Sequence, residues 1–461
     1  MKVTKILYLL IYGRWYFPLF SANDYLMLKR RLTQSLLVLI ITVFSEKAAA
    51  QRYLSDIDSS FFIKDTVRPV LKRFENLRIS GYLQPQFQVA QEKGAASYNG
   101  GNFSTFSNNR FMLRRARVRI DYFLATKDGF PKAVFTFQVD GTERGVGLRD
   151  VFVKVYEKKK HNFSLTAGMF ARPFGFEVNL SSQFREAPER GRMSQILMPS
   201  ERDLGAMITY DPLPKSARNK LFKIDAGIFN GQGLSGTTDF DSHKDFISRV
   251  TFKPQKLKKW ELSGGLSLLY GGWRQATKYV YETKTNTTGD KLYMVDSAIS
   301  NIGKIAPRHY YGADLQVKFK HGWGETELRN EYWRGSQPGT ATTSTNPGTL
   351  PDAPTYHRQF DGGFFFLLQH IVNRNNQLLV KYDWYDPNTE VEELEIGKPG
   401  TNFNATDVRY TTWGIGFLRV LNENLRLVVY YDIVKNETTQ LTGYTADKKD
   451  NVLTFRFHYR F

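Results

Sequence analysis

The chain has 461 residues, of which 41% are hydrophobic and 15% aromatic, and its 64 basic and 45 acidic residues give a formal net charge of +19. It contains no cysteine, which excludes a disulfide framework and a thiolate metal site. Mean hydropathy is -0.42, and beyond the N-terminus no apolar run reaches the about 20 residues that a transmembrane helix needs. These values argue against a helical membrane protein, and the basic balance favours an anionic partner such as nucleic acid, anionic lipid or an anionic solute.

A secretory signal peptide is predicted at residues 27–50. Three basic residues at 29–31 precede an apolar run from Leu36 to Phe44, and alanines at 48–50 come directly before Gln51. This order is typical of a signal peptide that is cleaved after its small residues, and the alternative is a buried N-terminal helix. Removing residues 1–50 takes away seven basic and two acidic residues and leaves a net charge of +14. The basic bias therefore belongs to the mature protein.

Two further segments flank this peptide. Because a signal peptide normally begins at the initiator methionine, residues 1–26 are interpreted as a gene-model extension with translation starting at Met27; the alternative is a real leader of unknown purpose. Residues 51–76 show no clean period and are predicted to be a periplasmic lead-in. Residues 77–461 then form the predicted folded domain.

From Leu77 onward, apolar and polar residues alternate in stretches that are typical of two-faced β-strands. The even number of stretches, about sixteen, is expected of a single-chain bacterial barrel. The stretches are residues 77–90, 111–123, 133–139, 151–156, 163–169, 204–210, 222–229, 246–252, 260–268, 311–319, 328–333, 360–371, 378–384, 408–420, 425–434 and 453–461.

The connections between these stretches alternate in length. Short links at 253–259 and 421–424 alternate with long polar ones at 271–308, 335–357 and 386–407. Outer-membrane barrels have short periplasmic turns and long external loops, whereas a soluble sandwich has no reason to sort its loops in this way. The sequence therefore predicts an all-β fold, a transmembrane antiparallel β-barrel. The aromatic C-terminal residue resembles the terminal signal by which barrel-assembly machinery recognises outer-membrane proteins.

Four motifs make the chain resemble the phosphate-selective porin O/P family, in the form common among Bacteroidetes. They are LRISGYLQPQF at 77–87, FMLRRARVRI at 111–120, GMFARPFGFE at 168–177 and ERDLGA at 201–206. The resemblance is dense over roughly residues 77–230 and weaker afterward. It implies a sixteen-stranded barrel, commonly trimeric, with a chain segment folded into the lumen.

Arginines of the second predicted strand share one face. Arg115, Arg117 and Arg119 alternate with apolar residues, and facing lipid would cost each about 2–4 kcal/mol near the midplane. We therefore expect them to face the lumen, where a row of guanidinium groups offers an anion successive sites of moderate depth. In the alternative interpretation they pair with carboxylates on adjacent strands, such as Asp140 and Asp150, and stiffen the wall.

The segment from 171 to 203 is long, follows a strand and is rich in arginine. The resemblance implies that it folds inward and narrows the pore, and the alternative is an ordinary surface loop. Arg114, by contrast, is expected on the outward face at the end of its strand, near a lipid headgroup. The arginines that the segment adds to the predicted anion pathway are Arg172, Arg185, Arg190, Arg192 and Arg202.

These observations lead to a functional hypothesis. The chain is expected to be a porin of a Gram-negative outer membrane that gives passive, anion-selective diffusion, with phosphate or polyphosphate as solute and a homotrimer in lipid and lipopolysaccharide as the assembly. No catalytic residue, cofactor or metal is predicted, because the seven histidines lack zinc spacing and no P-loop or GxSxG is present. No nucleic-acid partner is predicted, because aromatic residues alternate with basic ones. The alternatives are a general diffusion porin, a pore for other acidic solutes, a surface adhesin and a barrel enzyme.

Overall fold

The computed structural model describes residues 76–126, 129–212, 221–236, 238–371 and 375–461. The predicted extension and signal peptide, and all but the last residue of the predicted lead-in, lie outside the described residues. In these described ranges no helix combines the length and the apolarity needed to cross a bilayer.

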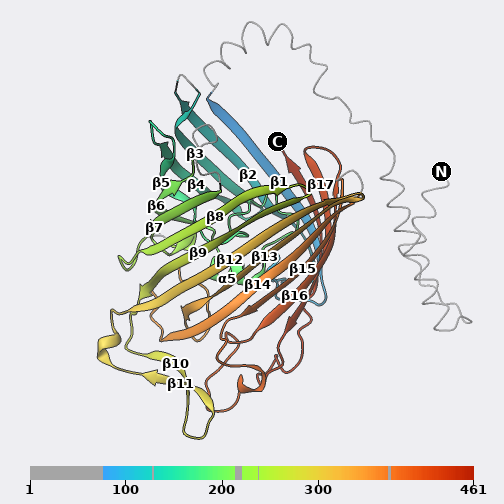
Figure 1. The fold of residues 1–461 in the computed structure, drawn as a ribbon. Helices are drawn as coiled ribbons and strands as arrows, with labels where there is room; N and C mark the ends of the chain where they lie inside the picture. Colours follow the sequence, from blue (N-terminus) through green and yellow to red (C-terminus); the bar gives the residue numbers. More distant parts are fainter. Residues whose placement is uncertain (1–75, 127–128, 213–220, 237, 372–374) are drawn as a thin grey trace, which may run out of the picture. The chain divides into compact units, whose positions relative to one another are not determined.

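Within the described part of the chain, sixteen strands form one closed antiparallel barrel (Figure 1). Strands that follow one another in the chain pair with one another, β9 pairs with β12, and β18 closes the ring on β1. The predicted all-β barrel is confirmed. The strands are β1 (Leu77–Ala90), β2 (Asn109–Ala125), β3 (Pro131–Thr142), β4 (Gly145–Tyr156), β5 (Phe163–Ala171), β6 (Arg202–Tyr210), β7 (Phe222–Phe229), β8 (Asp245–Leu257), β9 (Trp260–Arg274), β12 (Ile305–His321), β13 (Gly324–Gly339), β14 (Thr355–Ile371), β15 (Asn376–Asp386), β16 (Tyr410–Val420), β17 (Leu425–Asn436) and β18 (Val452–Arg460).

Side chains alternate between the two faces of the wall, as the period of two requires. In β1, Ile79 and Leu83 are exposed on the outer face, whereas Tyr82, Gln84 and Gln86 are buried inside the barrel. A strand in the hydrocarbon core of a bilayer must present apolar side chains to lipid and have all its backbone groups hydrogen-bonded. The closed ring meets both requirements. The barrel exterior therefore suits a bilayer.

The ring closes where the C-terminus meets β1. The amide of Phe461 donates to the carbonyl of Gly81 at 3.0 Å, and the amide of Gly81 donates back at 3.1 Å. A Cβ atom at Gly81 would lie 2.5 Å from both the Arg117 carbonyl oxygen and the Phe461 ring, so glycine permits this close approach. The aromatic residues at the end of the chain are exposed on the outer face, and these are Phe455, Phe457 and Tyr459 of β18 and the C-terminal Phe461.

Most long connections emerge at one end of the barrel and most short turns at the other, as predicted; the exceptions are the short connection between β3 and β4 and the long one between β6 and β7. The connection between β9 and β12 contains a hairpin that sequence patterning did not predict, β10 (Val280–Thr285) and β11 (Lys291–Asp296), near the bottom of Figure 1. Its first strand pairs in parallel with the start of β14. Three single-turn 3-10 helices lie in these connections, η2 (Gly233–Ser235), η3 (Ile299–Asn301) and η4 (Glu393–Glu395).

The largest apolar cluster lies inside the barrel, around a segment that enters the lumen. Residues 172–201, which join β5 to β6, are called the inward segment here, and they contain the short helix α5 (Arg192–Leu197). Phe174 of this segment contacts Trp333 edge to face, with ring centroids 4.7 Å apart. The apolar side of the inward segment therefore packs on the barrel wall, which agrees with the predicted inward fold. The wall side chains in this cluster are Phe170, Phe229, Ile247, Leu269, Tyr310, Trp333, Phe360 and Tyr385.

Candidate functional site in the barrel lumen

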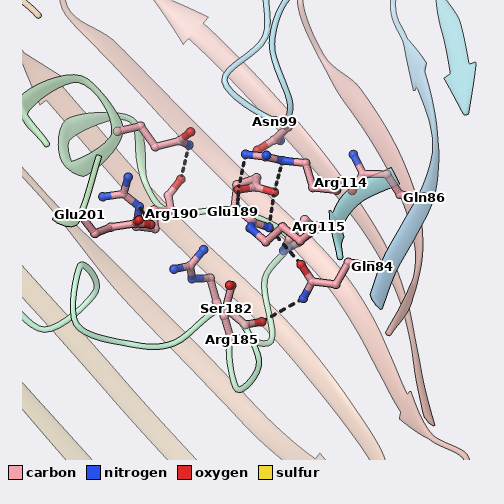
Figure 2. Close-up of polar contacts among 12 residues, drawn as sticks. Gln84, Gln86, Asn99, Arg114, Arg115, Ser182, Arg185, Glu189, Arg190 and Glu201 are labelled. Carbon is pink, nitrogen blue, oxygen red and sulfur yellow. Dashed lines mark hydrogen bonds and ion pairs between the residues drawn. The ribbon is translucent and has the colours of Figure 1, made fainter. Parts of the chain in front are cut away.

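Glu189 of the inward segment binds three guanidinium groups at once, and Figure 2 shows those of Arg114 and Arg115 beside it. The Nε of Arg114 lies 2.9 Å from its carboxylate, Nη2 of Arg115 lies at 2.6 Å, and Nη2 of Arg456 lies at 2.8 Å. Its side chain is only 3% exposed. Burial by itself would raise the pKa of Glu189, but the three arginines hold that pKa well below its ordinary value. The inward segment is thereby fixed to β2 and β18.

A β-bulge places Arg114 in this cluster. The pairing register shifts between Leu83 and Pro85 of β1, so that Arg114 and Arg115 together oppose the single residue Gln84. A bulge of this kind re-aims a side chain, and here both arginines reach the same carboxylate from inside the barrel. The expectation that Arg114 points outward to a lipid headgroup was wrong, because strict alternation takes no account of an extra residue in one strand.

The remaining arginines of the row also point inward, and both are paired. Arg117 lies with Nε 2.8 Å from the carboxylate of Asp140 and donates from Nη1 to Ser182 at 3.0 Å. Arg119 lies 2.8 Å from the carboxylate of Asp121, but its side chain is 37% exposed whereas that of Arg117 is 5% exposed. The inward orientation was predicted, and the pairing with Asp140 matches the alternative interpretation of the row.

Glu201 forms a second cluster at the end of the inward segment. It contacts Arg149 of β4 in a close ion pair, Arg190 at 3.3 Å and Arg202 at 3.2 Å. Arg202 also contacts Asp150 at 3.0 Å, so this carboxylate does not pair with the arginine row. Both ends of the arginine-rich part of the segment are therefore anchored by an acid that holds several guanidinium groups.

Two arginines of the inward segment are buried without a carboxylate partner among the described residues. Arg172 donates to the carbonyl of Ser200, and its Nε has no hydrogen-bond partner. Arg185 donates from Nη2 to the carbonyl of Leu180 at 3.1 Å, while its Nε and Nη1 are buried and unpaired. Guanidinium groups remain charged in proteins, so these two add positive charge to the lumen that no direct ion pair neutralises.

On the far wall, the inward segment is held by strands β13 and β15. Glu331 accepts hydrogen bonds from the backbone amides of Phe176 at 2.7 Å and Glu177 at 2.9 Å. The carboxylate of Glu177 in turn forms a close ion pair with Lys381. The segment is thus bonded to opposite sides of the barrel. Arg115 and Arg117 of the wall contact Glu189 and Ser182 of the segment, so these two arginines lie between the wall and the segment.

Sequence reasoning found the arginines but missed their acids. Glu189 and Glu201 are the carboxylates that organise the two clusters, and neither was singled out as a site residue. Arg149 and Arg456 were also missed as site residues. The signal that could have indicated these acids is the presence of glutamates next to arginines at positions 186–202 of the sequence. Among the residues described, no group of three or more His, Asp or Glu side chains could hold a metal ion.

Comparisons with known proteins give structural neighbours only. No family model and no curated protein matches the sequence. The anion-selective porin from Comamonas acidovorans is similar at 11% identity with a TM-score of 0.49, and the alignment covers 84% of this chain and 99% of the porin. The outer membrane channel DcaP of Acinetobacter baumannii is similar at 12% identity and a TM-score of 0.49, with 84% and 97% covered. OmpT of Vibrio cholerae, in its trimer form, follows at 11% identity and a TM-score of 0.47, with 84% and 99% covered.

At these identities and scores the functions of the neighbours are not transferred to this chain. The fold is established by the strand pairing itself, which closes a ring of sixteen antiparallel strands in the described residues. An even-numbered closed ring with an apolar exterior is the architecture of single-chain outer-membrane barrels of Gram-negative bacteria.

Proposed function

We propose that this chain is an outer-membrane porin through which small anions, inorganic phosphate or polyphosphate among them, diffuse passively. The observation that carries the proposal is the surplus of cations around the inward segment. Glu189 and Glu201 each bind three arginines, and Arg185 adds a charge without a carboxylate partner among the described residues. Fixed positive charge on a lumen with low-dielectric walls attracts anions and repels cations.

In this proposal the arginines of the pathway do two different things. Arg115 and Arg117 are buried, so they contribute to the field and hold the inward segment without touching a permeating ion. Arg119 on β2 and Arg192 on the inward segment keep exposed surface. These two residues are the ones that we expect to contact solutes directly.

A second candidate, the general diffusion porin, has its own supporting observation. All three arginines of the row contact a carboxylate, which reduces the field that the row projects. Asp383, Asp432 and Asp450 also line a small pocket beside the inward segment. Acids facing arginines across a lumen give weaker ion selectivity than a lumen of one sign.

Reversal potentials of purified protein in planar bilayers separate these two candidates. Under a potassium chloride gradient the proposed function predicts anion preference, and replacement of chloride by phosphate is expected to preserve the sign. A reversal potential near zero selects the general porin, and cation preference overturns the anion proposal. The proposal also includes a homotrimer in a membrane that contains lipopolysaccharide, for which the mass of the detergent-solubilised assembly is the test.

A further inference from the structure

A pocket lies at the barrel end that carries the long connections, on the outer side of the inward segment. Its volume is about 420 Å³, within the range of about 300–1,000 Å³ that holds small-molecule ligands. Hydroxyl-bearing residues 342–345 form one side of it. The other side chains that matter for recognition are Tyr98, Arg192, Tyr385, Tyr410, Tyr444 and Lys448.

Two cations, Arg192 and Lys448, and one carboxylate, Asp450, line this pocket, so its charge is positive on balance. The guanidinium carbon of Arg192 lies 3.7 Å from the ring centroid of Tyr410 and 4.3 Å from that of Tyr98, so two aromatic faces fix its plane. Its Nε is buried without a hydrogen-bond partner. Among the described residues no carboxylate forms a direct ion pair with the guanidinium, although Asp383 and Asp450 lie near it. A buried Nε is out of reach of a solute, so the two Nη groups of this fixed guanidinium are the donors that we expect to bind a carboxylate or phosphate.

The rest of the lining fits a hydroxylated body and not a bare ion. Tyrosine rings offer apolar faces with a polar tip, and the ammonium of Lys448 lies 3.5 Å from the ring centroid of Tyr444. Thr342 and Thr343 are exposed in this lining. The Thr342 hydroxyl contacts that of Thr340 at 3.2 Å, and the Thr343 hydroxyl accepts a hydrogen bond from the amide of Thr345 at 3.0 Å, which leaves the Thr343 hydroxyl proton for a solute. An inorganic phosphate would fill a small part of this volume and leave the aromatic and hydroxyl walls without contacts.

We propose that this pocket binds a sugar that carries a phosphate or carboxylate group. Arg192 receives the acidic group, the tyrosine rings cover the apolar face of the sugar ring, and residues 342–345 bind its hydroxyl groups. The inference rests on the proposed function, because a solute held here is cargo on its way to the lumen. A second, much smaller pocket of about 30 Å³ continues along the inward segment, and its arginines, Arg190 and Arg192, face Asp383, Asp432 and Asp450. The acidic group is therefore expected to stay in the larger pocket.

Binding to the purified, detergent-solubilised protein tests the inference by calorimetry with four probes. Glucose 6-phosphate and galacturonate are expected to bind, whereas glucose and inorganic phosphate are expected to bind at least about tenfold more weakly, since each lacks one half of the recognised chemistry. Arg192→Gln is expected to weaken both acidic sugars by about tenfold or more. Arg144→Gln is the matched control, because Arg144 lies in the short connection between β3 and β4 with its side chain 77% exposed.

A second variant, outside the inward segment, separates a loss of recognition from a structural disturbance that Arg192→Gln could cause in that segment. Thr343→Val keeps the shape of an exposed residue, and it is expected to weaken the acidic sugars while leaving inorganic phosphate unchanged. Equal binding of inorganic phosphate and glucose 6-phosphate, or no binding of either acidic sugar, overturns the inference. An anion-selective channel without sugar binding leaves the proposed function standing, whereas sugar binding to a channel without anion preference removes the proposed function and keeps the pocket.

Discussion

The arginines of β2 and Arg192 of the inward segment are the same residue type in opposite situations. Arg115 and Arg117 are buried and contact the carboxylates of Glu189 and Asp140. Arg192 is half-buried between two tyrosine rings and has no carboxylate partner in the described chain. A buried guanidinium must be compensated because its desolvation is costly, whereas one at a pocket keeps donors free for a solute. The difference teaches that an arginine row does not by itself make an ion pathway.

The largest effect is expected from Glu189→Gln. It leaves three guanidinium groups without their shared charge, and breaking a buried ion pair by removing one partner costs about 3–5 kcal/mol. The inward segment should detach from β2 and β18, which raises single-channel conductance and lowers the denaturant midpoint of the detergent-solubilised protein. Glu143→Gln, at a side chain that is 43% exposed, is the control. Normal conductance and stability in Glu189→Gln would show that the cluster does not hold the segment.

Arg117→Gln compared with Arg119→Gln sharpens the contrast within one row. Arg117 is buried against Asp140, so its loss should cost about 1–3 kcal/mol by leaving a carboxylate unpaired. Arg119 is more exposed, and its loss should cost less than about 1 kcal/mol. Selectivity is expected to change in the reverse order, with the larger shift toward cations in Arg119→Gln. Thermal melting and reversal potentials of both variants are the measurements, and equal stability losses would contradict the assignment.

Low pH is expected to loosen the inward segment, because it protonates the carboxylate of Glu189. Because the pKa of Glu189 is lower in the folded chain than in the unfolded chain, its contribution to stability is present above the unfolded pKa of about 4.3 and is lost as pH falls through the folded value. Conductance should therefore be steady from neutral pH down to about 5 and rise only in stronger acid. Glu189→Gln should lack this acid transition, and an identical pH profile in that variant would assign the change to another group.

Arg192→Gln is expected to have only a small effect on folding. It removes a cation that forms no direct ion pair in the described chain, so the free energy of unfolding should change by about 1 kcal/mol, through lost contact with aromatic rings and lost attraction to Asp383 and Asp450. Anion preference should decrease while conductance in symmetric salt stays close to that of the parent. Arg192→Lys should restore part of the preference, because it retains the charge. A stability loss as large as that of Glu189→Gln would place Arg192 among the structural arginines.

Much of the barrel could be predicted from local pattern. Alternation with a period of two is a property of each strand by itself, and it correctly indicated the sixteen strands, their order and the inward direction of Arg115, Arg117 and Arg119. The hairpin β10–β11 was missed because it lies within a long polar connection and packs on other connections. Its strands do not separate lumen from lipid, so they lack the alternation of apolar and polar residues that marks the strands of the wall.

The partners of the arginines were decided only by tertiary structure. Glu189 is joined to Arg456 across 267 positions of the chain, and no local pattern encodes such a contact. Arg114 was misplaced because a bulge is a property of two paired strands and not of one. Sequence by itself determined which face each strand offers to water, since transfer of charge into lipid is costly at every such position. Only the closed barrel decided which of those charges are neutralised and which remain free for a solute. The outcome depends on which carboxylates of the inward segment contact the arginines of the wall.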